Sequence, residues 1–210
     1  MGDKQTRRIR VKVRAFLMDR YPMTQDIFEA VMNSNPSRFH GKRRPVENIT
    51  WLDAVIFCDA LSKASGLDSV YEIKGKNTKA DFGKNGYRLP TESEWEYACL
   101  RKNADYADSD AVAWFNKHET STVGEREKNA SGLNDMLGNV WEWCQDWYQP
   151  HHQTRPLVDF QGPDDGDERV IRGGSWRSPP NRINPEARSR KHPLTRDETI
   201  GFRVVRREIT

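Results

Sequence analysis

The spacing of apolar residues predicts a strand and then a short helix at the start of the chain. Residues 9–16 alternate apolar and cationic side chains, which is typical of a half-buried strand with one charged, solvated face. Residues 24–32 predict a helix capped by Thr24 and ended by the polar run 33–37. Its inner face is expected to hold Ile27, Phe28 and Val31.

Two further helices carry the signature of a capping box, in which a hydroxyl and a carboxylate three residues later satisfy free amides. Thr50 with Asp53 opens one of them, which should end before Gly66. Thr91 with Glu94 opens the other. The inward positions of these two helices are Trp51, Ala54, Val55, Cys58, Leu61, Trp95, Ala98 and Cys99.

Strand-like segments dominate the remainder of the chain. Residues 71–87 predict a short hairpin, whereas 101–135 are polar, irregular and long for a loop, which suggests a functional role or anchoring by something other than packing. Three strand-like bursts follow at 139–148, 169–176 and 200–205. Because helices come early and strands late, without regular alternation, the pattern favours an α+β fold. Trp141 and Trp143 should share one face of their strand, and Trp147 and Trp176 are further candidates for the core.

Composition excludes disorder and a membrane span. The chain has 210 residues, 35% of them hydrophobic and 10% aromatic, and its mean hydropathy is −0.91. Since aromatic rings bury much surface, they can supply a large part of the core. No apolar run approaches the ~18 residues of a membrane helix, and no signal peptide is evident. We therefore expect a soluble, cytoplasmic single domain over residues 1–210.

Charge and metal-binding residue types narrow the function further. The net charge of +3, from 34 Lys and Arg against 31 Asp and Glu, is too balanced to indicate nucleic-acid binding. The three cysteines have no zinc-like spacing and are interpreted as buried structural thiols. The five histidines show no spacing that converges on a metal. They are His40, His118, His151, His152 and His192.

Several motifs together resemble the formylglycine-generating enzyme (sulfatase-modifying factor) family. The matching segments are 86–98 (GYRLPTESEWEYA), 135–143 (DMLGNVWEW), 172–176 (RGGSW), 200–203 (IGFR), 22–25 (PMTQ) and 35–39 (NPSRF). The resemblance implies a C-type-lectin-like α+β fold, irregular, with two or three short helices and small antiparallel sheets. It also implies that the family's opening strand is shortened here to Met1-Gly2.

The resemblance further implies a calcium loop but no copper chemistry. In the family, oxygens at the positions of Gly138, Asn139, Val140 and Glu142 hold calcium. The alternative is that Asn139 caps the turn and Glu142 pairs with a core arginine. Enzymatic members hold copper(I) with two cysteines, and those positions are Ser178 and Ile183 here. Because copper(I) prefers sulfur ligands, formylglycine chemistry and copper are not expected.

Ligand recognition is expected in the segment 177–199. This segment is rich in proline and arginine, is interpreted as an exposed loop, and corresponds in the family to cleft-lining or ligand-contacting residues. Arginines suit carboxylate or phosphate groups, and proline reduces the ordering cost of binding. A solvated basic loop is the plainer alternative. The candidate ligand-binding residues are Arg177, Ser178, Asn181, Arg182, Asn184, Arg190, Lys191 and His192.

Three functions fit this resemblance. The leading hypothesis is a non-oxidising binding or accessory domain that recognises a protein or acidic ligand. The second is an oxidoreductase of the formylglycine-generating or sulfoxide-synthase type with different or partner-supplied metal chemistry. Sulfoxide synthases take their iron-binding histidines from an additional helical domain, which we do not expect within these 210 residues. The third is a variable protein of a diversity-generating retroelement, which Lys191 and Glu198 disfavour because such diversification excludes Lys and Glu. The oligomeric state cannot be predicted.

Overall fold

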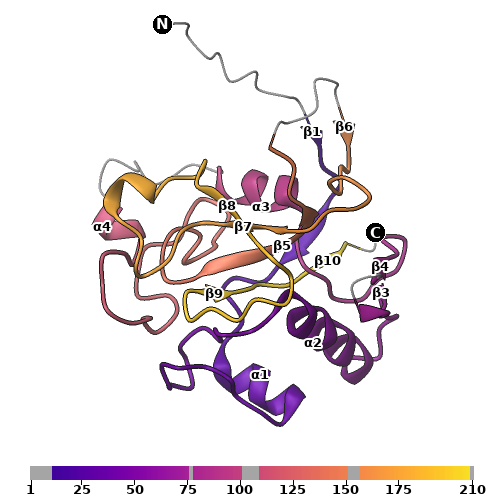
Figure 1. Ribbon diagram of the computed structural model, residues 1–210, viewed down its shortest axis with the longest axis horizontal. Coiled ribbons are helices and arrows are strands. Elements are labelled where there is room, and N and C mark those ends of the chain that lie inside the picture. The colour runs from indigo at the N-terminus through magenta and orange to yellow at the C-terminus, as the bar shows by residue number, and fades with distance from the viewer. Residues whose placement is uncertain (1–10, 76–77, 101–108, 151–156, 209–210) are drawn as a thin grey trace, which may run out of the picture.

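A four-stranded sheet forms the centre of the computed structural model, which describes residues 11–75, 78–100, 109–150 and 157–208 (Figure 1). The strand order is β8-β7-β5-β9, in which β5 pairs with β7 antiparallel and with β9 in parallel. β8 extends the sheet antiparallel to β7. The strands are β5 (Trp141–Trp147), β7 (Arg169–Arg172), β8 (Arg188–Lys191) and β9 (Ile200–Gly201).

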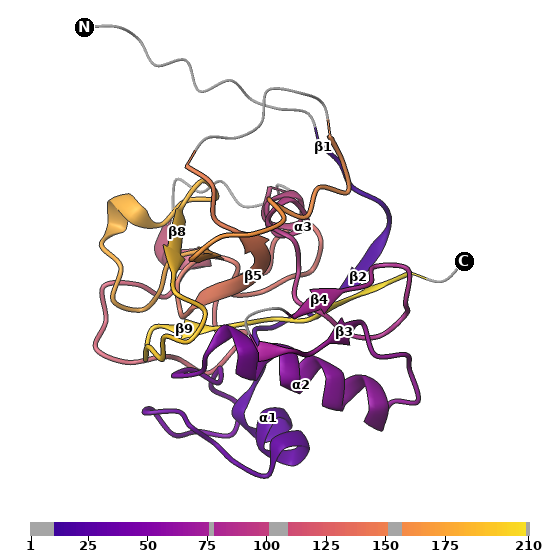
Figure 2. The same cartoon turned by 45° about the vertical axis from the view of Figure 1, so that its right-hand side comes forward.

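Helices cover both faces of this sheet. In Figures 1 and 2, α1 and α2 lie below the sheet and α3 lies above it. The helices are α1 (Gln25–Met32), α2 (Trp51–Ala64), α3 (Glu92–Cys99) and α4 (Ser109–Val112). Both predicted capping boxes are present, at Thr50 with Asp53 and at Thr91 with Glu94. None of the helices within the described ranges is long and apolar enough to cross a membrane.

Three two-stranded sheets complete the architecture. β1 pairs with β6 in parallel, whereas β2–β10 and β3–β4 are antiparallel. The β3–β4 pair confirms the hairpin predicted within 71–87. These strands are β1 (Val11–Lys12), β2 (Phe16–Met18), β3 (Tyr71–Glu72), β4 (Lys79–Ala80), β6 (Leu157–Val158) and β10 (Val205–Arg207).

The alternation of side chains along β5 builds two hydrophobic clusters, one on each face of the sheet. Trp143 is buried with residues of α1 and α2, and half-buried Trp141 packs against the same cluster. Cys144, the next residue after Trp143, packs with Trp95 of α3 in the second cluster. Because neighbouring strand residues point to opposite faces, this division follows from the sequence pattern. Trp176 is also buried, whereas Trp147 is half-buried.

The α+β class is confirmed, and the structure corrects four details of the expected elements. Residues 9–16 do not form one strand, because this segment changes its pairing partner: β1 pairs with β6, whereas β2, which begins at Phe16, pairs with β10. Residues 9 and 10 lie outside the described part. The burst at 200–205 is divided between β9 and β10. Ile27 is exposed because Gln25, Phe28, Val31 and Met32 form the inner face of α1, so the prediction is wrong for Ile27 and confirmed for Phe28 and Val31.

The fourth correction concerns the segment 177–199, which is not a continuous exposed loop. A short 3-10 helix, η2 (Pro180–Arg182), and the strand β8 lie within it. β8 pairs along its whole length with β7, from Arg169↔Lys191 to Arg172↔Arg188. Its four polar residues show no apolar alternation, so the pairing with β7 and not the pattern determines this strand.

Candidate functional site

A glycine pair at the end of β7 brings together the two residues that stand at the expected copper positions. Gly173 and Gly174 have φ angles of 96° and 80°, a conformation that side chains disfavour. A Cβ added at Gly174 would lie 2.7 Å from Ile183 Cδ1 and 3.5 Å from Ser178 Oγ. Ser178 and Ile183, five positions apart in the sequence, thus lie beside the same backbone point.

Both residues of this pair are buried and neither is a thiol. The Ser178 hydroxyl accepts a hydrogen bond from the Ser175 backbone at 3.0 Å, and the Ser178 carbonyl accepts one from Asn116 N at 3.1 Å. Ile183 packs in the cluster that contains Trp95. A hydroxyl used in the local turn and an alkyl chain provide no soft metal ligand.

The three cysteines lie elsewhere in the core. Cys58, Cys99 and Cys144 are buried and form no disulfide. Burial raises the pKa of the Cys58 thiol, and desolvation also raises the pKa of Cys144. Because the thiolate is the reactive form, Cys58 and Cys144 are inert structural groups. This confirms the prediction that the cysteines are buried.

An exposed cluster of two arginines and one glutamate lies next to the Ser178–Ile183 pair. Arg177 and Arg38 both pair with the carboxylate of Glu198, although Arg38 and Glu198 are 160 positions apart. Arg177 lies 4.5 Å from the centre of the Trp176 ring, and Arg38 lies 5.4 Å from the Phe39 ring. We call these five residues the Arg38–Arg177 surface.

The aromatic rings form a rigid base for this surface. Phe39 and Trp176 meet edge to face at 5.3 Å between ring centres. The Trp176 indole also donates to the Glu198 carbonyl at 3.2 Å. The arginine side chains are 62% and 60% exposed, whereas Glu198 is 18% exposed. The guanidinium groups are therefore held in place from below and open to solvent above.

A buried carboxyl lies beneath the same surface. Glu47 is fully buried, and its Oε1 accepts a hydrogen bond from Phe39 N at 2.9 Å. Its Oε2 has no hydrogen-bond partner among the residues that the structure describes. Burial raises the pKa of Glu47 to about 7, and the nearby Glu198 charge adds to this effect. In contrast, the hydrogen bond from Arg38 is the largest cause that lowers the pKa of Glu198.

Apart from Arg177, the predicted ligand-binding residues occupy three kinds of position: the turns of the segment 177–199, the strand β8, and the buried turn at Ser178. Asn181, Arg182 and His192 are exposed, whereas Asn184 is half-buried. Arg190 and Lys191 belong to β8, where they pair with Glu168 at 2.8 Å and Asp197 at 3.0 Å. Ser178 lies below the surface. Arg177 is the predicted residue that the structure places in the Arg38–Arg177 surface.

Sequence reasoning did not assign Arg38, Phe39 and Glu198 to this surface. The motif at 35–39 contributes to the family resemblance, but nothing in its local pattern connects it with residue 198. The connection is made by the tertiary fold, in which Asn48 N bonds to the Asp197 carbonyl at 3.1 Å.

The residues expected to hold calcium do not fit that ion in this arrangement. Calcium takes about six to eight oxygen ligands. Both Glu142 oxygens instead accept hydrogen bonds from Arg203, each at 2.7 Å. The Asn139 side chain bonds to the Ser121 backbone at both ends, and the Asn139 carbonyl accepts from Trp176 N. A cation bound to Glu142 would face a buried guanidinium.

The alternative interpretation of Glu142, as the partner of a core arginine, matches this geometry. Arg203 is 0% exposed and Glu142 is 1% exposed, so the pair lies in the interior. Glu142 Oε2 also accepts from the Trp95 indole at 2.8 Å, and Arg203 donates to the Asn134 carbonyl at 3.0 Å. A buried charge needs such a complete set of partners. The network begins directly after Gly138, Asn139 and Val140, which precede β5 in the sequence.

The described residues contain no group of three or more histidine, cysteine, aspartate or glutamate side chains placed to hold a metal. His40, His118 and His192 are exposed and lie in separate segments. His151 and His152 lie outside the described residues.

The fold and the position of the Ser178–Ile183 pair define the class of this protein. It has an α+β fold in which an RGGSW motif leads into a buried turn beside an arginine-rich surface. The sulfatase-modifying factor enzyme 1-like domain matches residues 1–208. The chain therefore belongs to this family of formylglycine-generating enzyme-like domains.

The relatives of this chain include a protein named as a chaperone, an enzyme and a variable protein. The chain is 33% identical over 235 aligned positions to the chaperone protein LppX of Paenibacillus barcinonensis, which covers 91% of this chain and 80% of that protein. It is 30% identical over 192 positions to the formylglycine-generating enzyme of Mus musculus, covering 80% of this chain but 45% of the enzyme. The solved structure of Treponema denticola variable protein 1 is similar with a TM-score of 0.88 and 31% identity, covering 94% of this chain and 86% of that one.

Proposed function

We propose that this domain is a non-oxidising member of its family that binds an acidic protein or another acidic ligand through the Arg38–Arg177 surface and the adjoining segment 177–199. The observation that carries the proposal is that two arginines bind the carboxylate of Glu198 next to the Phe39 and Trp176 rings. The carboxylate of a ligand can form the same kind of ion pair with these arginines from the solvent side.

The charge and rigidity of the surface support an acidic ligand. Two guanidinium groups face one carboxylate, which leaves a net positive charge at the surface. Arginine presents several N–H donors in a planar fork that matches a carboxylate. Because Glu198 and the two rings fix both side chains before binding, less conformational entropy is lost when a ligand arrives. Exposed Arg182, at the end of η2, adds a further cation to the same segment.

The residues at the copper positions support the absence of oxidation. Ser178 and Ile183 both lie beside Gly174, but neither provides a sulfur ligand. Lys191 and Glu198 take part in ion pairs of the fold, which does not favour sequence diversification at these positions.

An array of matched peptides tests the proposal. Each acidic peptide is paired with a copy in which Asp and Glu are replaced by Asn and Gln, and the purified protein is applied to both. We expect binding to the acidic members, with Arg177→Ala and Arg182→Ala weakening it about tenfold, or ~1.4 kcal/mol. Lys12→Ala removes a charge from β1, outside the surface, and should change nothing. Equal binding to both members of the pairs would contradict the proposal.

A further inference from the structure

A pocket separate from the Arg38–Arg177 surface lies where the three two-stranded sheets meet the start of α3. Five segments form it: residues 13–15 between β1 and β2, 82–83 after β4, 88–94 at the start of α3, 158–161 after β6, and Arg207 of β10. Its volume is about 410 Å³. None of the residues that line it belongs to the Arg38–Arg177 surface. In Figures 1 and 2, β1 lies in the upper part of the molecule.

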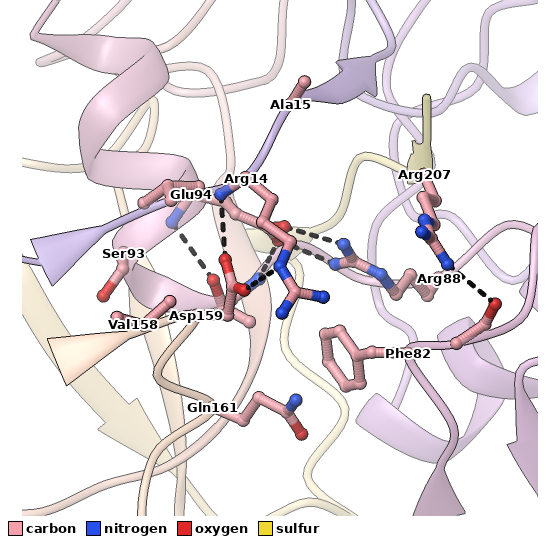
Figure 3. Close-up of a pocket in the computed structure, with 13 residues that line it drawn as sticks. Arg14, Ala15, Phe82, Arg88, Ser93, Glu94, Val158, Asp159, Gln161 and Arg207 are labelled. Carbon is pink, nitrogen blue, oxygen red and sulfur yellow. Dashed lines mark hydrogen bonds and ion pairs between the residues drawn. The ribbon is translucent and has the colours of Figure 1, made fainter. Parts of the chain in front are cut away.

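The floor of this pocket is a fixed and neutral ion pair. Arg88 and Glu94 are buried and form two parallel hydrogen bonds of 2.7 Å. Glu94 also accepts from Thr91 N at 2.8 Å as part of the capping box of α3. The Arg88 guanidinium lies 4.3 Å from the centre of the Phe82 ring. Figure 3 shows the two side chains next to each other. Because these charges are already satisfied, the floor contributes shape and not a binding charge.

Arg14 provides the unsatisfied hydrogen-bond donors. Its backbone N and its Nε reach Asp159 at 2.8 and 2.7 Å, which fixes the position of the side chain. Its two terminal nitrogens make no hydrogen bond to any residue that the structure describes. Figure 3 shows them on the side of the guanidinium that faces Phe82. The Arg14 side chain is 75% exposed, so these donors are open to a ligand.

The residues that line the pocket carry a net positive charge, which attracts anions. Three arginines, Arg14, Arg88 and Arg207, face two carboxylates, Glu94 and Asp159, which leaves a net charge of +1. The arginine without a carboxylate partner is Arg207, which donates to the Gly83 carbonyl at 3.2 Å. Apolar contact is available as well, from the half-buried Phe82 ring and from Val158, which is 62% exposed.

We propose that this Arg14 pocket binds a small organic carboxylate that carries an apolar group. The carboxylate pairs with the terminal nitrogens of Arg14, and the apolar group lies against Phe82 and Val158. The fork of Arg14 matches the two oxygens of a carboxylate, and its pairing with Asp159 keeps it oriented. Pockets that bind small molecules combine apolar walls with a few placed polar groups in this way. The proposal is independent of the function proposed above.

A pair of probes that differ only in charge tests this proposal. 3-Phenylpropionate and 3-phenylpropanamide have the same size and the same ring, and their dissociation constants are measured from backbone amide shifts in NMR spectra. We expect the acid to bind about tenfold more tightly than the amide, because only the acid pairs with Arg14. Equal affinity of acid and amide, or no binding of either, would overturn the proposal.

Variants with matched controls locate the binding. Arg14→Gln should remove most of the preference for the acid over the amide, and its exposed ion pair should matter little for the melting temperature. Arg207→Gln should weaken the acid, whereas Arg206→Gln removes the same charge from β10 outside the pocket and should not. Arg177→Ala should also leave this binding unchanged, which separates the outcome from that of the proposed function. An equal effect of Arg14→Gln and Arg206→Gln would refute the assignment.

A third probe distinguishes two sources of the carboxylate. N-acetyl-glycyl-phenylalanine carries the same phenyl and carboxylate groups at the end of a peptide chain. If it binds more tightly than 3-phenylpropionate and its C-terminal amide does not bind, the pocket recognises a peptide C-terminus. If 3-phenylpropionate binds at least as tightly, the ligand is a free small acid. Either result supports carboxylate binding at Arg14.

Discussion

Replacing Glu142 by glutamine tests the interior network that links β5 to the C-terminal segment. The substitution keeps the shape of the side chain but removes its charge, and it leaves the guanidinium of Arg203 buried without a counter-ion. Two hydrogen bonds of 2.7 Å then lose their ionic character. Breaking one partner of a buried ion pair costs ~3–5 kcal/mol, so the free energy of unfolding should fall by that amount.

Denaturant unfolding of a double-mutant cycle measures this effect. Arg203→Met alone should also be strongly destabilising, because it leaves the Glu142 charge buried. The double variant should lose less than the sum of the two single losses, since neither charge remains alone. Calcium and EDTA should shift none of these curves. An unfolding free energy within ~1 kcal/mol of the wild type for Glu142→Gln, or a loss that appears only with calcium present, would refute this interpretation.

Three other predictions follow from the same structure. The protein should not convert cysteine in a sulfatase peptide to formylglycine with copper and oxygen, because Ser178 and Ile183 replace the thiol pair; mass spectrometric detection of formylglycine would contradict this. Trp143→Ala should cost ~3–5 kcal/mol, since Trp143 is 0% exposed, and an unchanged melting temperature would show that the inward face is wrong. The raised pKa of Glu47, about 7, means that the folded state holds its proton more tightly than the unfolded state, so stability should fall as pH rises from about 4.5 to 7. Glu47→Gln should flatten this slope, and a slope unchanged by the substitution would be inconsistent with the buried carboxyl.

Local signals in the sequence predicted the elements that local interactions determine. The capping boxes at Thr50 and Thr91 involve partners three residues away, and both are present as expected. The alternation in β5 likewise predicted that Trp141 and Trp143 pack against one cluster. β8 was missed because its strand state depends on pairing with β7 and on carboxylates from distant segments, such as Glu92, which binds Arg188.

The sequence likewise predicted the parts of the candidate site that lie in one motif, but not the contacts between distant segments. The motif around Gly174 identified Ser178 and Ile183, and the fold brings these two residues together. The Arg38–Glu198 contact joins residues 160 positions apart, and no local pattern marks either side chain as part of a site. The resemblance suggested calcium at Asn139 and Glu142, but the buried partner of Glu142 is visible only in the folded arrangement.

The selectivity of the Arg38–Arg177 surface for carboxylates can be measured as one ratio. The dissociation constant of the best acidic peptide is compared with that of its Asn and Gln counterpart, on the wild type and on the double variant Arg38→Gln/Arg177→Gln. The wild type should prefer the acidic peptide at least about tenfold, and this preference should fall to about one in the double variant. An undiminished preference in the double variant would show that acidic ligands bind elsewhere.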